Sequence, residues 1–217
     1  MENPAFAFAA AAIISGGVYL AAIRYEKQMI KYILKPGTMV LIILFSISGG
    51  ALNSIYGWLI IAGLLLSMAG DVFLMLPSDR FLQGLASFFA AHLLYAAAFW
   101  NEALLKFLDI LPVIAVLFLV ISGSMFFSSL KKEVSEEGGN GLLIAVTSYI
   151  AVISIMVFAA ALTGSTAAVS GALLFYFSDA VLAWNRFKER FSIAEYLVMG
   201  SYFGAQLFIA YSVHLLG

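Results

Sequence analysis

Eight long runs of apolar residues follow one another along this chain of 217 residues. Each run is close to the roughly 20 residues that an α-helix needs to cross a hydrocarbon core about 30 Å thick. The runs are continuous rather than alternating at every second residue, which argues against barrel strands. The sequence therefore predicts an all-α polytopic membrane protein, a bundle of eight transmembrane helices at residues 4–23, 36–52, 56–76, 81–100, 108–130, 141–162, 166–184 and 192–216.

Composition excludes other classes of protein. Hydrophobic residues make up 64% of the chain and charged residues 11%, whereas a soluble domain has roughly 45–50% and about 25%. This excludes a water-soluble globule and a disordered chain, and a net charge of −1 provides no basic surface for nucleic acid. The absence of cysteine excludes disulfides and thiolate chemistry. The longest polar connection, residues 131–140, is too short for an extramembrane domain, so we expect a single transmembrane domain over residues 1–217.

Basic residues lie almost entirely on one side of the predicted bundle. The connections after the first, third, fifth and seventh runs hold ten of the eleven lysines and arginines, and only Lys106 falls on the other side. By the positive-inside rule, these connections are cytoplasmic and both termini are non-cytoplasmic. No basic residue precedes the first run, which is the reverse of a secretory signal, so we expect this run to be a retained span. The short connections favour a bacterial cytoplasmic membrane.

The two halves of the chain resemble each other. A leucine pair precedes Asp71 in the third run, and another precedes Asp179 in the seventh, at an offset of 108 residues. Segment 87–93 likewise aligns with segment 201–207, at an offset of 114. Four spans per half would give both halves the same orientation, which predicts a parallel 4+4 repeat with the two aspartates facing each other. The predicted halves are residues 1–104 and 105–217.

Both aspartates lie well inside apolar runs. Placing an aspartate at the centre of a spanning helix costs about 2.5–3.5 kcal/mol, so such a residue indicates a functional site. Asp71 lies six residues before Pro77, and Asp179 lies six before Asn185. Both are thus about 9 Å inside the cytoplasmic ends of their helices. The alternative is that they bridge helices by hydrogen bonds or pair with Lys35 or an arginine.

Further polar side chains fall at helical spacing. Glu195, Tyr202 and Gln206 form a stripe in the last run, and His92 lies one turn from Tyr95 in the fourth. Because a polar group facing lipid is costly, we expect these faces to point into the bundle. The structural alternatives are an interfacial position for Glu195 and a hydrogen-bonded core role for His92.

In their order and spacing, the motifs are similar to those of one known family. They are Lys35-Pro36, Gly70-Asp71 with Leu74, Gly84 before Phe88, His92 with Tyr95, Tyr149 to Met156, Gly171-Ala172 with Phe175, Ser178-Asp179, and Tyr202 with Gln206. They resemble the YhhN family of membrane proteins, whose animal relatives are the TMEM86 lysoplasmalogenases, over about residues 30–212. The resemblance implies an alkenyl ether hydrolase that cleaves the vinyl ether bond of lysoplasmalogens. The products would be a fatty aldehyde and glycerophosphoethanolamine or glycerophosphocholine, and the family's paired aspartates would correspond to Asp71 and Asp179.

Hydrolysis of a vinyl ether needs a proton donor for the β-carbon, an anion near the resulting oxocarbenium ion, and a water. Two carboxylates in one dry pocket suit this task, so we expect Asp71 and Asp179 to be catalytic, with their two roles unassigned. Lys35 and Arg186 are expected to meet the substrate's phosphate; the alternative for Lys35 is a helix start with Pro36 in its first turn. No metal or cofactor is predicted. The predicted substrate-binding residues are Lys35, His92, Tyr95, Tyr149, Ser178, Glu195, Tyr202 and Gln206.

Two other functions remain open at this stage. A proton-coupled transporter of a small molecule or lipid also suits a parallel repeat with buried acids. A non-catalytic lipid-binding or assembly protein would tolerate loss of both carboxylates. The lack of Gly- or Pro-broken helices at matching positions favours the hydrolase, and the expected partner is a lysophospholipid within the bilayer.

Overall fold

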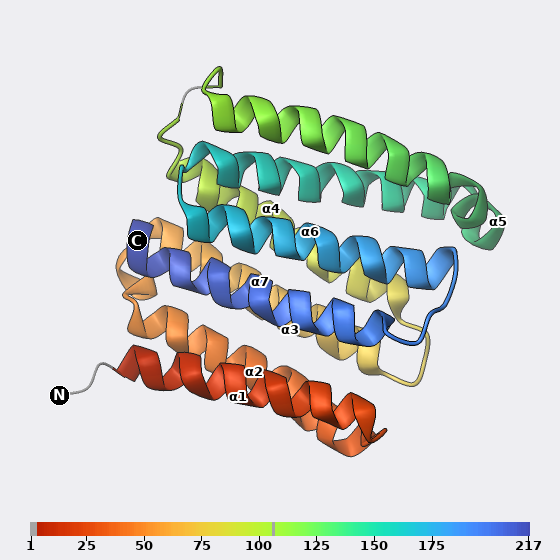
Figure 1. Cartoon of the computed structure of the whole chain (residues 1–217), viewed down its shortest axis with the longest axis horizontal. Coiled ribbons are helices and arrows are strands. Elements are labelled where there is room, and N and C mark those ends of the chain that lie inside the picture. Colours follow the sequence, from red (N-terminus) through yellow and green to blue (C-terminus); the bar gives the residue numbers. More distant parts are fainter. Residues whose placement is uncertain (1–3, 106) are drawn as a thin grey trace.

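The computed structural model describes residues 4–105 and 107–217, and these residues form helices joined by short connections (Figure 1). Among them, seven helices are long and apolar enough to cross a membrane. They are α1 (Pro4–Arg24), α2 (Gln28–Ser48), α3 (Ile55–Met75), α4 (Phe81–Asn101), α5 (Ile110–Leu162), α6 (Thr166–Phe187) and α7 (Ala194–Leu216), with a short 3-10 helix, η1 (Ala51–Asn53), after α2. The prediction of an all-helical membrane protein is confirmed.

Helix α5 contains two of the predicted runs. Its 53 residues are interrupted by non-helical dihedral angles at Gly138 and Gly139, and the φ of +62° at Gly139 favours glycine. The chain turns back at this pair, and the two arms of α5 lie side by side (Figure 1). Leu130 of the first arm and Val146 of the second belong to one buried cluster. The prediction that residues 131–140 form a polar connection between two helices is therefore wrong, because the helix continues through the charged residues as far as Gly138.

Helix α2 begins at Gln28, eight residues before the start predicted at Pro36. The interpretation of Pro36 as a first-turn proline is wrong, since it lies inside the helix. Pro36 removes only the hydrogen bond to the carbonyl four residues earlier. The polar first turns instead contact other helices, because Lys31 pairs with Glu195 and Lys35 with Asp71. These tertiary contacts extend the helix beyond its apolar run.

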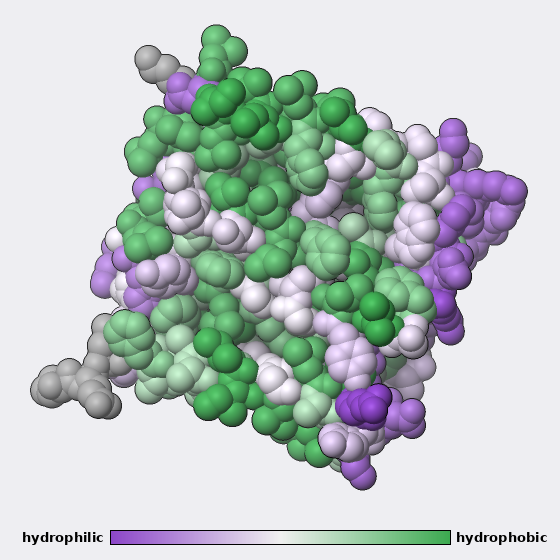
Figure 2. All heavy atoms as spheres, in the orientation of Figure 1, coloured by the Kyte–Doolittle hydropathy of each residue, from purple (hydrophilic) through white to green (hydrophobic). Residues whose placement is uncertain are grey.

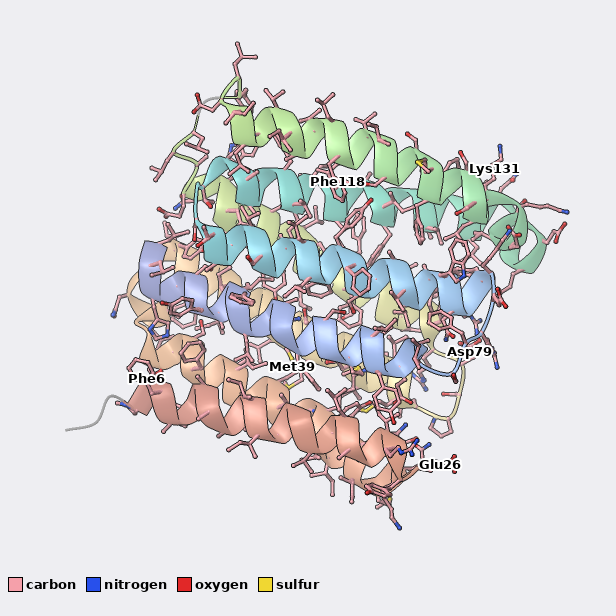
Figure 3. The ribbon with its side chains drawn as sticks, in the orientation of Figure 1. Phe6, Glu26, Met39, Asp79, Phe118 and Lys131 are labelled. Atoms are coloured by element: carbon pink, nitrogen blue, oxygen red, sulfur yellow. The ribbon has the colours of Figure 1, made fainter. Side chains whose placement is uncertain are left out.

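The helices lie nearly along one common axis, and contacts join α1 to α2, α3 to α4 and α6 to α7 (Figure 1). Helices α2 and α7 also touch. Glu26, Asp79 and Lys131 lie at one end of the bundle, and Phe6 lies at the other (Figure 3). Hydrophilic residues gather most densely at the end that holds Glu26, Asp79 and Lys131 (Figure 2). We call this the charged end. Lys106, predicted on the opposite side, lies outside the described residues.

An ionic cluster joins three segments at the charged end. Arg186 of α6 donates to Asp79 at 2.9 Å and to Glu137 at 2.7 Å, and its guanidinium lies 5.2 Å from the ring centroid of Phe81. The backbone N–H of Phe81 and the Arg186 guanidinium hold the pKa of Asp79 below its usual range. Arg186 is therefore committed to the packing of α6 against the α3–α4 connection and α5.

Close helix contacts depend on glycine. A Cβ atom added to Gly171 in α6 would lie 3.0 Å from the backbone nitrogen of Ile209 and 3.1 Å from the backbone oxygen of Ala205, both in α7. Small residues allow backbones to approach in this way. A backbone atom of a packed helix cannot swing aside, so the whole helix would have to move.

We predict that Gly171→Ala destabilises the protein by about 1–3 kcal/mol, because it overpacks the contact between α6 and α7. Unfolding in mixed SDS micelles measures this change. Gly200→Ala in α7 is the matched control, since nothing lies within 4 Å of a Cβ atom at that position, and alanine favours the helix by about 1 kcal/mol. Wild-type stability of Gly171→Ala would contradict the close contact.

Candidate active site

A cavity of about 390 Å³ lies among α1, α2, α3, α6 and α7 and reaches the first turns of α2 and α7. We call it the polar cavity because charged and hydroxyl side chains form much of its wall. These polar residues of the wall include Tyr19, Gln28, Lys31, Lys35, Asp71, Asp179, Glu195 and Tyr202. The cavity thus joins residues from both ends of the sequence.

Asp71 in α3 is buried and fully paired. Only 1% of the residue is exposed, and Lys35 Nζ lies 2.9 Å from its Oδ1. The Tyr202 hydroxyl donates to Oδ2 at 2.6 Å. Lys35 and Tyr202 thus supply a cation and a hydrogen-bond donor to its two oxygens, which offsets part of the cost of burying a charge there. Lys35, expected to meet phosphate, is the ion-pair partner of Asp71, and this pairing was the structural alternative considered for the aspartates.

Asp179 in α6 has different partners. The Tyr149 hydroxyl donates to its Oδ2 at 2.6 Å, and His92 Nε2 lies 3.1 Å from the same oxygen. Within residues 4–105 and 107–217, no hydrogen bond or ion pair involves Oδ1. The side chain is 13% exposed, against 2% for Asp71. Asp179 is therefore the more accessible of the two carboxyl groups, and no lysine or arginine of the described residues pairs with it.

His92 in α4 is a buried positioning group for Asp179. Its ring packs edge to face against Phe175 at 4.6 Å and Tyr149 at 5.2 Å between centroids. A carboxylate oxygen only accepts, so Nε2 of His92 carries the hydrogen when Asp179 is ionised. His92 is 0% exposed and belongs to the wall of neither cavity, so the expectation that it lines the site is corrected.

A second, apolar cavity of about 50 Å³ lies among α3, α4, α5 and α6. Its wall includes Phe81, Phe126, Val146, Tyr149, Ile153 and Phe187. It shares Leu74, Phe88, Asp179 and Leu182 with the polar cavity. Among the described residues, Asp179 is the one charged side chain that belongs to both walls, so its carboxyl group lies where a polar and an apolar compartment meet.

Four other predicted site residues have structural partners. Tyr95 donates to Gln206 Oε1 at 2.8 Å, and neither side chain belongs to the wall of either cavity. The expectation that they line the site is corrected: the Tyr95 hydroxyl and Gln206 Oε1 bond each other, and Gln206 Nε2 has no hydrogen-bond partner among the described residues. Ser178 lines the polar cavity, but its hydroxyl donates to the backbone oxygen of Val198 at 3.0 Å and so bridges α6 to α7. Arg186, expected at the phosphate, lies in the ionic cluster with Asp79.

The outer part of the polar cavity holds residues that sequence reasoning assigned only to topology or not at all. Lys31 Nζ lies 2.7 Å from Glu195 Oε1, and the Tyr19 hydroxyl donates to the same oxygen at 3.2 Å. Gln28, Lys31 and Lys35 are spaced three and four residues apart, which is the signal that one face of α2 lines a polar site. Within the described ranges, no three His, Asp or Glu side chains are grouped to hold a metal ion.

The sequence matches a family model over residues 30–213, and that model describes the YhhN family. The chain belongs to the YhhN family. Lysoplasmalogenase TMEM86B from Sus scrofa is 35% identical over 150 residues, which cover 69% of this chain and 61% of that protein. The Mus musculus protein of the same name is 29% identical over 178 residues, covering 82% of this chain and 72% of the relative.

A bacterial member of the family aligns over more of its length. The uncharacterized membrane protein YhhN of Escherichia coli O157:H7 is 24% identical over 192 residues, covering 85% of this chain and 88% of that protein. No solved structure matches the chain. Together with the apolar helices, these relatives identify an integral membrane protein.

We predict that Lys35→Met destabilises the protein by about 3–5 kcal/mol, because it leaves the Asp71 carboxylate buried without a counter-ion. SDS-induced unfolding measures the loss. The double variant Lys35→Met, Asp71→Asn should recover most of it, since the uncompensated charge is removed. If the single and double variants were equally unstable, the ion pair would not be the source of the effect.

Proposed function

We propose that this protein is a lysoplasmalogenase that hydrolyses the vinyl ether bond of a lysophospholipid within the membrane. Curated relatives from pig, mouse and rat carry the name lysoplasmalogenase, at 29–35% identity. The observation that carries the proposal is the position of Asp179 in the walls of both cavities. A lysolipid has a polar headgroup and an apolar chain, and the vinyl ether bond lies between them.

In the proposed arrangement the headgroup occupies the polar cavity, and the apolar cavity, at about 50 Å³, takes up only the part of the chain next to the vinyl ether bond. The reacting bond then lies next to Asp179. Phe81, Phe126 and Phe187 would contact the chain, while lysines and a glutamate remain near the headgroup. Binding sites for small amphipathic ligands typically combine an apolar wall with a few polar groups.

In the proposed mechanism, protonated Asp179 gives its proton to the β-carbon of the vinyl ether, and the π electrons form the new C–H bond. The resulting oxocarbenium ion takes up a water at the carbon bonded to oxygen, and the carboxylate of Asp179 accepts a proton from that water. The hemiacetal then breaks its C–O bond, giving an aldehyde and the free hydroxyl of the glycerol part. One carboxyl group acts first as acid and then as base, as in retaining glycosidases.

Asp71 has the complementary role. Lys35 keeps it ionised, so it has no proton to give, but its negative charge lies in the wall of the same cavity. A fixed anion in a dry site stabilises a cationic intermediate without reorganisation at the moment of reaction. We therefore assign the acid–base role to Asp179 and the electrostatic role to Asp71.

We predict that Asp179→Asn lowers the rate of aldehyde release from a lysoplasmenyl lipid by about 10²–10⁴-fold, the size expected for loss of a general acid. Purified protein in detergent provides the assay, and folded protein is confirmed by size-exclusion chromatography. Asp79→Asn is the matched control, because this aspartate lies in the α3–α4 connection at the charged end and its side chain is 65% exposed.

Retention of full activity by both Asp179→Asn and Asp71→Asn would contradict the mechanism. If the folded protein released no aldehyde from lysoplasmenyl lipids with any headgroup, a proton-coupled transporter would be the better explanation. Detergent solution contains no proton gradient, so aldehyde release there separates a hydrolase from a carrier.

We further propose that each arm of α5 crosses the membrane, so that the chain has eight spans in two parallel halves, residues 1–104 and 105–217. Two glycine contacts support a duplication. Gly63 in α3 faces the ring of Tyr95 in α4, and Gly171 in α6 faces Ile209 in α7. The glycines are 108 residues apart and their partners 114, the two offsets of the sequence repeat.

The charged end is proposed to be cytoplasmic, with both termini on the other side of a bacterial cytoplasmic membrane. The bias of basic residues and the alignment over 88% of an E. coli relative support this orientation and location.

We predict that cysteines introduced at Lys27 and Glu136 react with a membrane-impermeant maleimide only in inverted vesicles, whereas Leu108→Cys reacts only in intact cells. The natural sequence has no cysteine, so each label reports one position. All three residues are exposed. Labelling of Glu136→Cys and Leu108→Cys from the same side would contradict the proposal that the first arm of α5 crosses the membrane.

A further inference from the structure

The outer part of the polar cavity holds two opposite charges contributed by different helices. Lys31 comes from the second turn of α2 and Glu195 from the first turn of α7, and Nζ lies 2.7 Å from Oε1. Both side chains line the cavity. The two carboxylates differ in exposure, because the Glu195 side chain is 42% exposed and that of Asp71 is 2% exposed, whereas Lys31 and Lys35 are 13% and 9% exposed. The Glu195 carboxylate is therefore accessible to a ligand, while its partner Lys31 is mostly buried.

We propose that Lys31 and Glu195 form a headgroup subsite for a phosphoethanolamine group, with the phosphate at Lys31 and the primary ammonium at Glu195. The inference rests on the proposed lysolipid hydrolase and names the headgroup that this site selects. A zwitterion carries the same two charges as the pair, so binding replaces one salt bridge by two and leaves neither charge without a partner.

The position of Lys31 fits the phosphate. Its side chain is 13% exposed, and Gln28, one turn earlier on α2, lines the same cavity and provides amide donors. A lysine ammonium binds phosphate as a point charge. Lys35, the next lysine on this face, is occupied by Asp71 at 2.9 Å, so Lys31 is the cation of the cavity that a phosphate reaches first.

The surroundings of Glu195 favour a primary ammonium over choline. A primary ammonium donates hydrogen bonds to carboxylate oxygens, whereas a trimethylammonium group has no N–H and is bound by the faces of aromatic rings. Tyr19 contacts Glu195 through its hydroxyl group, which donates to the carboxylate, and its ring packs against Phe203 at 5.5 Å between centroids. The group that Glu195 offers a ligand is thus a hydrogen-bond acceptor.

The first experiment compares lysoplasmenyl lipids that carry ethanolamine, choline or glycerol headgroups. We expect KM to rise in that order. Glu195→Gln should raise KM for the ethanolamine lipid about tenfold, change KM for the choline lipid less than twofold, and leave kcat within twofold. Lys31→Gln should raise KM for all three lipids, because each has a phosphate. Glu26→Gln and Lys27→Gln, in the α1–α2 connection outside the cavity wall, are the charge-matched controls.

A charge swap separates recognition from a structural salt bridge. The double variant Lys31→Glu, Glu195→Lys keeps the ion pair but reverses it. A purely structural pair would be restored, with wild-type KM values. The proposed subsite predicts that the raised KM for the ethanolamine lipid remains although the ion pair is formed again.

A binding measurement tests the subsite without hydrolysis. Soluble glycerophosphoethanolamine should raise the thermal unfolding midpoint of the detergent-solubilised protein, and Glu195→Gln should abolish this shift. Inorganic phosphate at the same concentration separates a headgroup site from a plain phosphate site, because it has no ammonium and should give no shift that depends on Glu195. An unchanged KM ratio and an unchanged thermal shift in Glu195→Gln would overturn the subsite. If the wild-type protein showed the thermal shift but released no aldehyde from any of the three lipids, the proposed function would be overturned instead.

Discussion

The low dielectric of the bundle interior governs this structure, because a carboxylate buried there must be paired with a cation or hydrogen-bond donors. Asp71 meets that requirement through Lys35 of α2 and Tyr202 of α7. The pair therefore ties α2, α3 and α7 together around one atom group. It also explains why α2 begins at Gln28, well before its apolar run. The polar cavity lies beside these contacts, where charged and hydroxyl side chains line the space between the helices.

The two aspartates have equivalent neighbours by position but different neighbours by chemistry. Asp71 is bonded by α2 and α7, and Asp179 by α4 and the second arm of α5. In the proposed repeat, each aspartate thus has one partner from the second span of its own half and one from the fourth span of the other half. The first half supplies a lysine, the second a tyrosine. In the proposed mechanism, this difference in partners is what separates the electrostatic role of Asp71 from the acid–base role of Asp179.

The helices and the two carboxylates could be predicted from the sequence because apolar length and intramembrane charge are local signals. Helix boundaries set by distant partners could not, as the start of α2 and the continuation of α5 to Gly138 demonstrate. Helical spacing alone also did not show which polar side chains on a helix face line the cavity. Tyr95 and Gln206 have the spacing of site residues, yet they bond each other behind the cavity. Lys31 and Tyr19 were missed because their common partner, Glu195, is more than 160 residues away.

The central claim, that Asp179 protonates the β-carbon of a vinyl ether, makes a direct isotopic prediction. Hydrolysis of a lysoplasmenyl lipid in D₂O should place one deuterium on C2 of the released aldehyde, as measured by mass spectrometry after immediate trapping. Unlabelled aldehyde incubated in parallel corrects for exchange after release. An aldehyde without deuterium at C2 would contradict protonation of the β-carbon, and with it the role assigned to Asp179.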